Sequence, residues 1–135
     1  MINDKLTKEL QEQIAENEEE ITKIKNGEVY STNEVKTNKT WIDGKPIYKK
    51  VFNTNIDTST VGWKEVGTLE FDEIVNSSFI CTTTNEPTRI RTNNTYCNLS
   101  FYNNKCYIAG TGAWDSTENK LMLKKIIVEY TKQTN

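Results

Sequence analysis

The chain has 135 residues, of which 35% are hydrophobic, and this is enough for one modest core rather than two. A formal net charge of -2 with a pI near 5.3 gives no basic surface for nucleic acid, and no apolar run is long enough to cross a bilayer. The chain also lacks histidine, the commonest general base and metal ligand. We therefore expect one domain with an appendage, made in a cytosol, with no nucleic-acid partner and no membrane insertion.

Residues 4–26 predict a helix, because they are rich in Glu, Lys and Gln and contain neither Pro nor Gly. Seam residues spaced four, three, four and three apart follow the a/d pattern of a coiled coil: Leu10, Ile14, Asn17, Ile21 and Ile24. Isoleucine at both a and d favours three or more strands, and a seam asparagine fixes the register. We expect residues 1–27 to form a homotrimeric stalk. The alternative is an amphipathic helix that packs on its own domain.

The next predicted element is a hairpin over residues 34–52, with its turn at Asp43 and Gly44. Asp-Gly between strand-forming runs indicates a two-residue type I′ loop, which pairs Trp41 with Pro46. Alternation then places Trp41, Pro46, Tyr48 and Phe52 on the core face and Ile47, Lys49 and Val51 on the opposite face.

A second two-residue hairpin is predicted at Asn103-Asn104, because asparagine tolerates positive φ. Its register pairs Tyr102 with Lys105, Phe101 with Cys106, Leu99 with Ile108 and Cys97 with Gly110. The apolar face comprises Cys97, Leu99, Phe101, Cys106, Ile108 and Gly110. The three cysteines make an odd count without C-x-x-C spacing, so we expect them to be reduced and buried.

The last predicted strand runs from Lys120 to Thr131, with apolar residues at alternate positions. Polar turns separate several short strands, and no further helical pattern follows the first. Residues 28–135 are therefore expected to form an all-β head, an antiparallel β-sandwich.

Trp114 is the best candidate for ligand contact, since its loop has small and polar neighbours. An indole there could stack on a sugar ring while Asp115 and Asn119 form hydrogen bonds. The alternative is a loop anchor packed on the end of the sandwich. Tyr102 and Tyr107, on the non-core face of the second hairpin together with Tyr96, either contact a ligand or pack on neighbouring protomers. Trp63 is interpreted as a core residue.

Catalytic chemistry has little support in the sequence. The carboxylates Glu65, Glu70, Asp72 and Glu73 could supply a glycosidase-like pair, but such a pair is defined by spatial separation, and the alternative is a set of solvated loop residues. No glycine-rich phosphate loop or calcium loop is present. We expect a non-enzymatic protein without a cofactor or metal.

Residues 30–52, YSTNEVKTNKTWIDGKPIYKKVF, resemble the opening of the head domains of tailed-phage tail-fibre and receptor-binding proteins, and residues 128–132, VEYTK, resemble their last strand. The resemblance implies a jelly-roll-like sandwich carried as a homotrimer on a stalk in the virion tail, with other tail or virion proteins as partners. It also implies recognition of a host-surface glycan or protein. The step from Ile14 to Asn17 resembles trimeric fibre and adhesin stalks in which asparagines surround an anion, which implies an anion at the Asn17 layer. There are two alternatives. The first is a structural connector, baseplate or capsid-decoration protein without host contact, and the second is a surface-glycan hydrolase.

Overall fold

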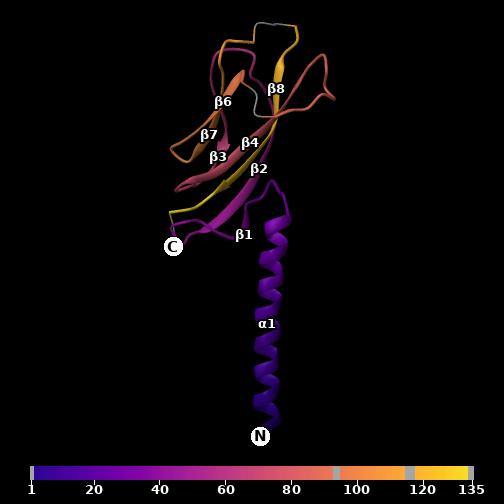
Figure 1. The fold of residues 1–135 in the computed structure, drawn as a ribbon, viewed down its shortest axis with the longest axis vertical. Coiled ribbons are helices and arrows are strands. Elements are labelled where there is room, and N and C mark those ends of the chain that lie inside the picture. Colours follow the sequence, from indigo (N-terminus) through magenta and orange to yellow (C-terminus); the bar gives the residue numbers. More distant parts are fainter. Residues whose placement is uncertain (1, 93–94, 115–117, 134–135) are drawn as a thin grey trace.

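The computed structural model describes residues 2–92, 95–114 and 118–133 (Figure 1), as one long N-terminal helix and an antiparallel β head. The predicted mostly-β head behind a single helix is confirmed. The elements are α1 (Ile2–Glu28), β1 (Val35–Thr40), β2 (Pro46–Asp57), β3 (Gly62–Thr68), β4 (Ile74–Thr83), β5 (Arg91–Thr92), β6 (Cys97–Tyr102), β7 (Lys105–Gly110) and β8 (Leu121–Tyr130).

Helix α1 projects from the head, and only its C-terminal end lies beside β1 (Figure 1). Its apolar stripe is uncovered in the single chain, with Leu10 57% exposed, Ile14 56% and Ile21 50%. The side chain of Asn17 accepts a hydrogen bond from Gln13 Nε2 at 3.1 Å. No described helix is both long and apolar enough to span a membrane. In water, such a helix gains most of its stability from burial of its apolar stripe.

The head consists of two antiparallel sheets, one in the strand order β1-β2-β8-β4-β5 and the other in the order β3-β7-β6. Side chains from both sheets contribute to one hydrophobic cluster, with β8 at the centre of the larger sheet. Its buried members are Phe52, Leu69, Phe79, Cys81, Cys97, Cys106, Ile108, Leu121, Leu123, Ile126, Val128 and Tyr130. The outer faces of the two sheets therefore point in opposite directions, away from this shared core.

The first hairpin differs from its predicted register by one residue. Trp41 pairs with Lys45 through a hydrogen bond from its N–H to the Lys45 carbonyl at 2.9 Å, so the predicted Trp41–Pro46 pairing is wrong. Gly44 has a φ of 87° and donates to the Trp41 carbonyl, whereas Asp43 is not in the positive-φ region. The Asp43 carboxylate accepts from the Lys45 N–H at 3.0 Å. The loop is thus a type I turn followed by one left-handed glycine, which gives three loop residues instead of two.

Both faces of β2 are buried, although the sequence identified only one as core. Ile47 and Lys49 are each 4% exposed and Val51 is 9% exposed, on the face opposite the shared core. The link between α1 and β1 contacts two of them: the Val51 N–H donates to the Ser31 carbonyl at 2.8 Å, and the Tyr30 ring lies 4.1 Å from Lys49 Nζ. Residues close in sequence to the helix therefore form a cover over the larger sheet.

The second hairpin is confirmed in turn and register. Asn103 and Asn104 have φ of 50° and 57°, and the pairs Tyr102–Lys105 and Cys97–Gly110 form as predicted. Its predicted apolar face lies in the core or packs against it. The three cysteines are free and buried, which confirms their expected environment. The predicted last strand is β8.

Candidate functional site

The outer face of the three-stranded sheet presents a row of aromatic and small polar side chains. Residues paired directly across strands share a face, and β7 pairs Tyr107 with Glu65 of β3 on one side and with Ser100 of β6 on the other. Because the adjacent residues Cys106 and Ile108 are fully buried, strand alternation directs Tyr107 outward.

These side chains enclose a groove of about 380 Å³, lined by Trp63, Ser100, Tyr102 and Tyr107. Ligand pockets occupy roughly 300 to 1,000 Å³, so the groove is large enough for a small ligand or one unit of a longer one. Trp63 is 59% exposed and Tyr102 is 66% exposed. Two large aromatic side chains that remain this exposed on one face are available for contact with a partner.

An ion pair lies beside the groove on the same outer face. Lys105 Nζ is 2.9 Å from Glu65 Oε1, and both side chains are about half exposed. The hydrogen bond to Glu65, with the negative charge of that carboxylate, raises the pKa of Lys105, so the ammonium is charged throughout the neutral range. Exposed pairs of this kind contribute little to stability and exchange partners readily. The pair therefore supplies a donor and an acceptor that hydroxyl groups of a ligand could use.

The chemistry of this groove suits a carbohydrate. Aromatic faces bind the apolar C–H face of a sugar ring, while tyrosine and serine hydroxyls and a nearby charged pair satisfy its hydroxyl groups. Among the described residues, no group of three or more cysteines and carboxylates is arranged to hold a metal ion.

The interpretation of Trp63 as a core residue is wrong. Trp63 pairs with Ala109 and shares the outer face with Glu65, whereas the core-facing residue of this strand segment is Val66. Alternation along residues 62–66 separates Trp63 and Glu65 from Lys64 and Val66, and because each face carries one charged residue, the sequence did not show which face is buried.

The Trp114 loop is arranged as an anchor. The indole Nε1 donates to the Asn119 carbonyl at 2.7 Å, and the ring meets Tyr96 edge-to-face with centroids 5.2 Å apart. The side-chain oxygen of Asn119 accepts from the Asn85 N–H at 2.9 Å, which ties two loops together. Asp115 lies outside the described residues. The structure therefore brings Tyr102 and Tyr107 together in the groove and gives Trp114 and Asn119 bonds within the head.

Three of the four candidate catalytic carboxylates are engaged by other side chains. Asp72 forms an ion pair with Lys45, and Glu73 accepts a 2.6 Å hydrogen bond from the Trp41 indole. These contacts fasten the tip of the first hairpin to the segment before β4. Glu65 belongs to the ion pair beside the groove. These three carboxylates therefore each have a side-chain partner within the head.

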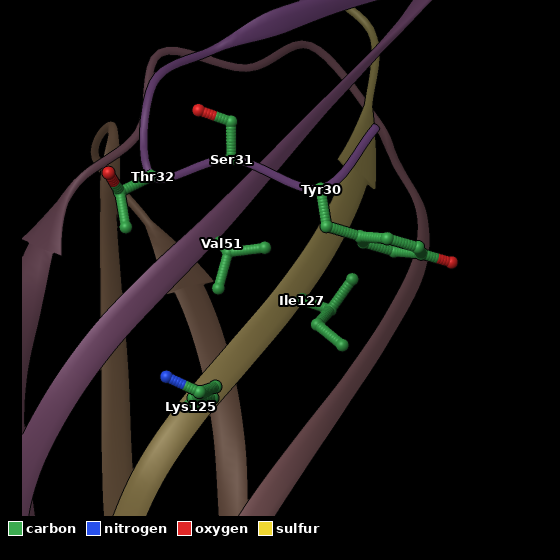
Figure 2. A pocket seen from close by; sticks show the side chains of 6 residues that line it. All are labelled: Tyr30, Ser31, Thr32, Val51, Lys125 and Ile127. Carbon is green, nitrogen blue, oxygen red and sulfur yellow. The ribbon is translucent and has the colours of Figure 1, made fainter. Parts of the chain in front are cut away.

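A second hollow, of about 280 Å³, lies on the outer face of the larger sheet. Figure 2 shows Tyr30, Ser31 and Thr32 crossing above β2 and β8, from which Val51 and Ile127 point upward, with Lys125 at one end. Tyr30 is 65% exposed and forms one wall. This hollow adjoins the end of α1.

Comparison of the chain with protein-family models, curated proteins and solved structures found no match.

Proposed function

We propose that this chain is the host-recognition head of a tailed-phage tail fibre, a homotrimeric virion component that binds a host-surface glycan without catalysis. In this proposal the head is a jelly-roll-like β-sandwich and α1 is a parallel three-stranded coiled coil. The protein would be made in the host cytoplasm and assembled into the virion tail with other phage proteins. The resemblance of residues 30–52 and 128–132 to such heads supports this assignment.

The observation that carries the proposal is the aromatic groove on β3, β6 and β7. Trp63 and Tyr102 keep more than half of their surface exposed, which is costly in water unless a partner uses that surface. Tyrosine and tryptophan give large contact areas at low entropic cost, because each has only two side-chain torsions to fix. A shallow groove of this kind is expected to bind a sugar weakly at each site.

Assembly through α1 would compensate for weak individual sites. The exposed stripe on α1 contains Ile14, Ile21 and Ile24, each about half exposed in the single chain. Three heads on one stalk can raise apparent affinity by roughly 10² to 10⁴ without any new contact. The two surfaces thus have complementary roles, in which the stripe joins the copies and the groove contacts the host.

A structural connector is the second candidate, and one observation favours it. Ile42, at the tip of the first hairpin, is 90% exposed, and an isoleucine at such a tip could dock on another virion protein. This connector would bind isolated virion proteins and no glycan. Its binding would depend on Ile42 rather than on the aromatic groove.

The test is binding of the full-length protein to an array of purified bacterial cell-surface polysaccharides. We expect wild-type protein to bind at least one, and Trp63→Ala to lower apparent affinity at least tenfold with little change in thermal stability. Ile42→Ala is the matched control, an exposed apolar residue outside the groove, and should bind as wild type does. Ile21→Asp should give a monomer that retains weak monovalent binding.

Three results would contradict the proposal. Wild-type protein that binds no polysaccharide but captures other virion proteins would identify the connector. Binding by Trp63→Ala as strong as that of the wild type would show that the groove has no part in recognition. Hydrolysis of a bound polysaccharide would show an enzyme.

A further inference from the structure

The apolar stripe of α1 continues onto the head. Beyond Ile21 and Ile24, the chain leaves the helix through Val29, 46% exposed, and Tyr30, 65% exposed. These residues lead directly into the hollow above β2 and β8 (Figure 2). Exposed apolar side chains therefore lie on the last described turn of the predicted seam and again at Val29 and Tyr30, next to the face of the larger sheet.

The wall of this hollow is preformed. The Tyr30 ring lies 4.1 Å from Lys49 Nζ, and Lys49 is only 4% exposed, so the contact is largely shielded from water. A cation–π contact of a desolvated ammonium is stronger than one at the surface. The hydrogen bond from Val51 N–H to Ser31 O at 2.8 Å holds the same segment down. Tyr30 thus keeps its exposed face available at little entropic cost.

The position of the hollow determines which partner fits it. In a parallel three-stranded coiled coil, the residues just beyond the last seam position remain close to the threefold axis. Tyr30 follows Ile24 by only six residues (30 − 24 = 6), so the linkers of neighbouring subunits would lie side by side. In a cyclic trimer the two surfaces that meet differ, so each subunit needs a hollow and an apolar segment to enter the next one.

We infer that a second copy of this chain fills the hollow of Tyr30, Val51 and Ile127, with the Val29–Tyr30 segment of a neighbouring subunit docked against it. The inference rests on the proposed trimer and identifies the surface through which its heads contact one another. Because the outer faces of the two sheets point in opposite directions, docking on the larger sheet leaves the aromatic groove of the smaller one facing outward. The heads would then be held as a rigid cluster and not tethered independently.

The test compares thiol accessibility in the trimer and in the Ile21→Asp monomer. A cysteine is introduced as Lys125→Cys at the hollow, or as Lys36→Cys on β1 as an exposed control; Lys36 does not line the hollow. The three native thiols are buried and do not compete. We expect Lys125→Cys to react with a maleimide at least tenfold more slowly in the trimer than in the monomer, and Lys36→Cys to react equally in both.

A second variant measures the contribution of the contact to assembly. Ile127→Lys places a charge in the hollow, and we expect the trimer dissociation constant to rise at least tenfold in sedimentation, with Ile42→Lys unchanged. If Ile127→Lys fails to fold, the thiol comparison decides alone. Equal reactivity of Lys125→Cys in trimer and monomer would overturn head docking and leave the trimer intact. A wild-type protein that is monomeric at all concentrations would refute the trimer itself.

Discussion

Removal of the Tyr130 hydroxyl is the most direct test of how the α1–β1 link is fastened to the head. Tyr130 is fully buried, and its hydroxyl donates to Glu34 Oε2 at 2.5 Å, across 96 residues of sequence. Glu34 also forms an ion pair with Lys132, and the Tyr130 ring stacks on Tyr48 with centroids 6.1 Å apart. This one contact therefore joins the link before β1 to the end of the central strand β8.

The expected magnitude follows from the partners that remain. A hydrogen bond to a charged group is worth about 1.5 to 3 kcal/mol. In Tyr130→Phe the Glu34 carboxylate keeps its ion pair with Lys132 and is 33% exposed, so water can replace the lost donor. The loss of stability should therefore lie toward the lower end of this range. Glu34→Ala instead leaves a buried hydroxyl without its acceptor and should cost more. We expect about 1 to 2 kcal/mol for Tyr130→Phe and about 2 to 3 kcal/mol for Glu34→Ala.

Urea unfolding at fixed protein concentration measures both variants, and the double variant gives the coupling between them. Tyr102→Phe, which removes an exposed tyrosine hydroxyl, is the control and should be neutral. If Tyr130→Phe changes the free energy of unfolding by less than 0.3 kcal/mol, roughly the error of additivity, the contact does not fasten the link.

The pH dependence of the free energy of unfolding above pH 10 tests the same cluster of Tyr130, Glu34 and Lys132. Burial, together with the hydrogen bond to Glu34, raises the pKa of Tyr130 above its ordinary 10.0, and the hydrogen bond to Glu34 raises the pKa of Lys132 above 10.5. Groups with a raised folded-state pKa contribute stability fully below the unfolded pKa and lose it as pH rises. Stability should therefore fall as pH rises above 10, and Tyr130→Phe should reduce that slope.

The remaining predictions concern the loop anchor, the thiols and the core. Trp114→Ala should lower stability by about 2 to 4 kcal/mol in thermal unfolding, since it removes a packed ring and a buried donor; a stable variant that loses glycan binding would instead assign Trp114 to recognition. Burial raises the pKa of Cys106 to about 12, and all three cysteines are buried, so a disulfide reagent at pH 8 should label no thiol before unfolding and three after it. Ile108→Val should cost about 0.5 to 1.5 kcal/mol, because Ile108 is fully buried, and a stabilised variant would show that the site is overpacked.

Local rules fixed the helix and the second hairpin. The polar sequence of residues 4–26, without Pro or Gly, predicted α1, and the helix extends a little beyond both predicted ends, from Ile2 to Glu28. Asn103-Asn104 fixed both turn and register, since two consecutive asparagines supply the positive φ that a two-residue loop needs. Each of these outcomes depends on residues near in sequence, so the sequence alone was enough.

The first hairpin shows where local rules are ambiguous. Asp-Gly fits a two-residue type I′ loop and also a type I turn followed by a glycine bulge. The Asp43 side chain accepts from the Lys45 N–H and favours the second, in which only Gly44 needs positive φ. This three-residue loop shifts the observed register of the hairpin by one residue from the predicted register.

Burial was decided by segments far apart in sequence. Lys49 is buried beneath the ring of Tyr30, which lies 19 residues earlier in the chain, whereas Trp63 remains 59% exposed on the outer face of its sheet. Alternation divides a strand into two faces but does not show which of them another segment will cover. The sequence therefore determined the helix, the mostly-β character of the head and the second hairpin turn, while the loop type of the first hairpin, the aromatic groove and the hollow beside α1 depended on the tertiary structure.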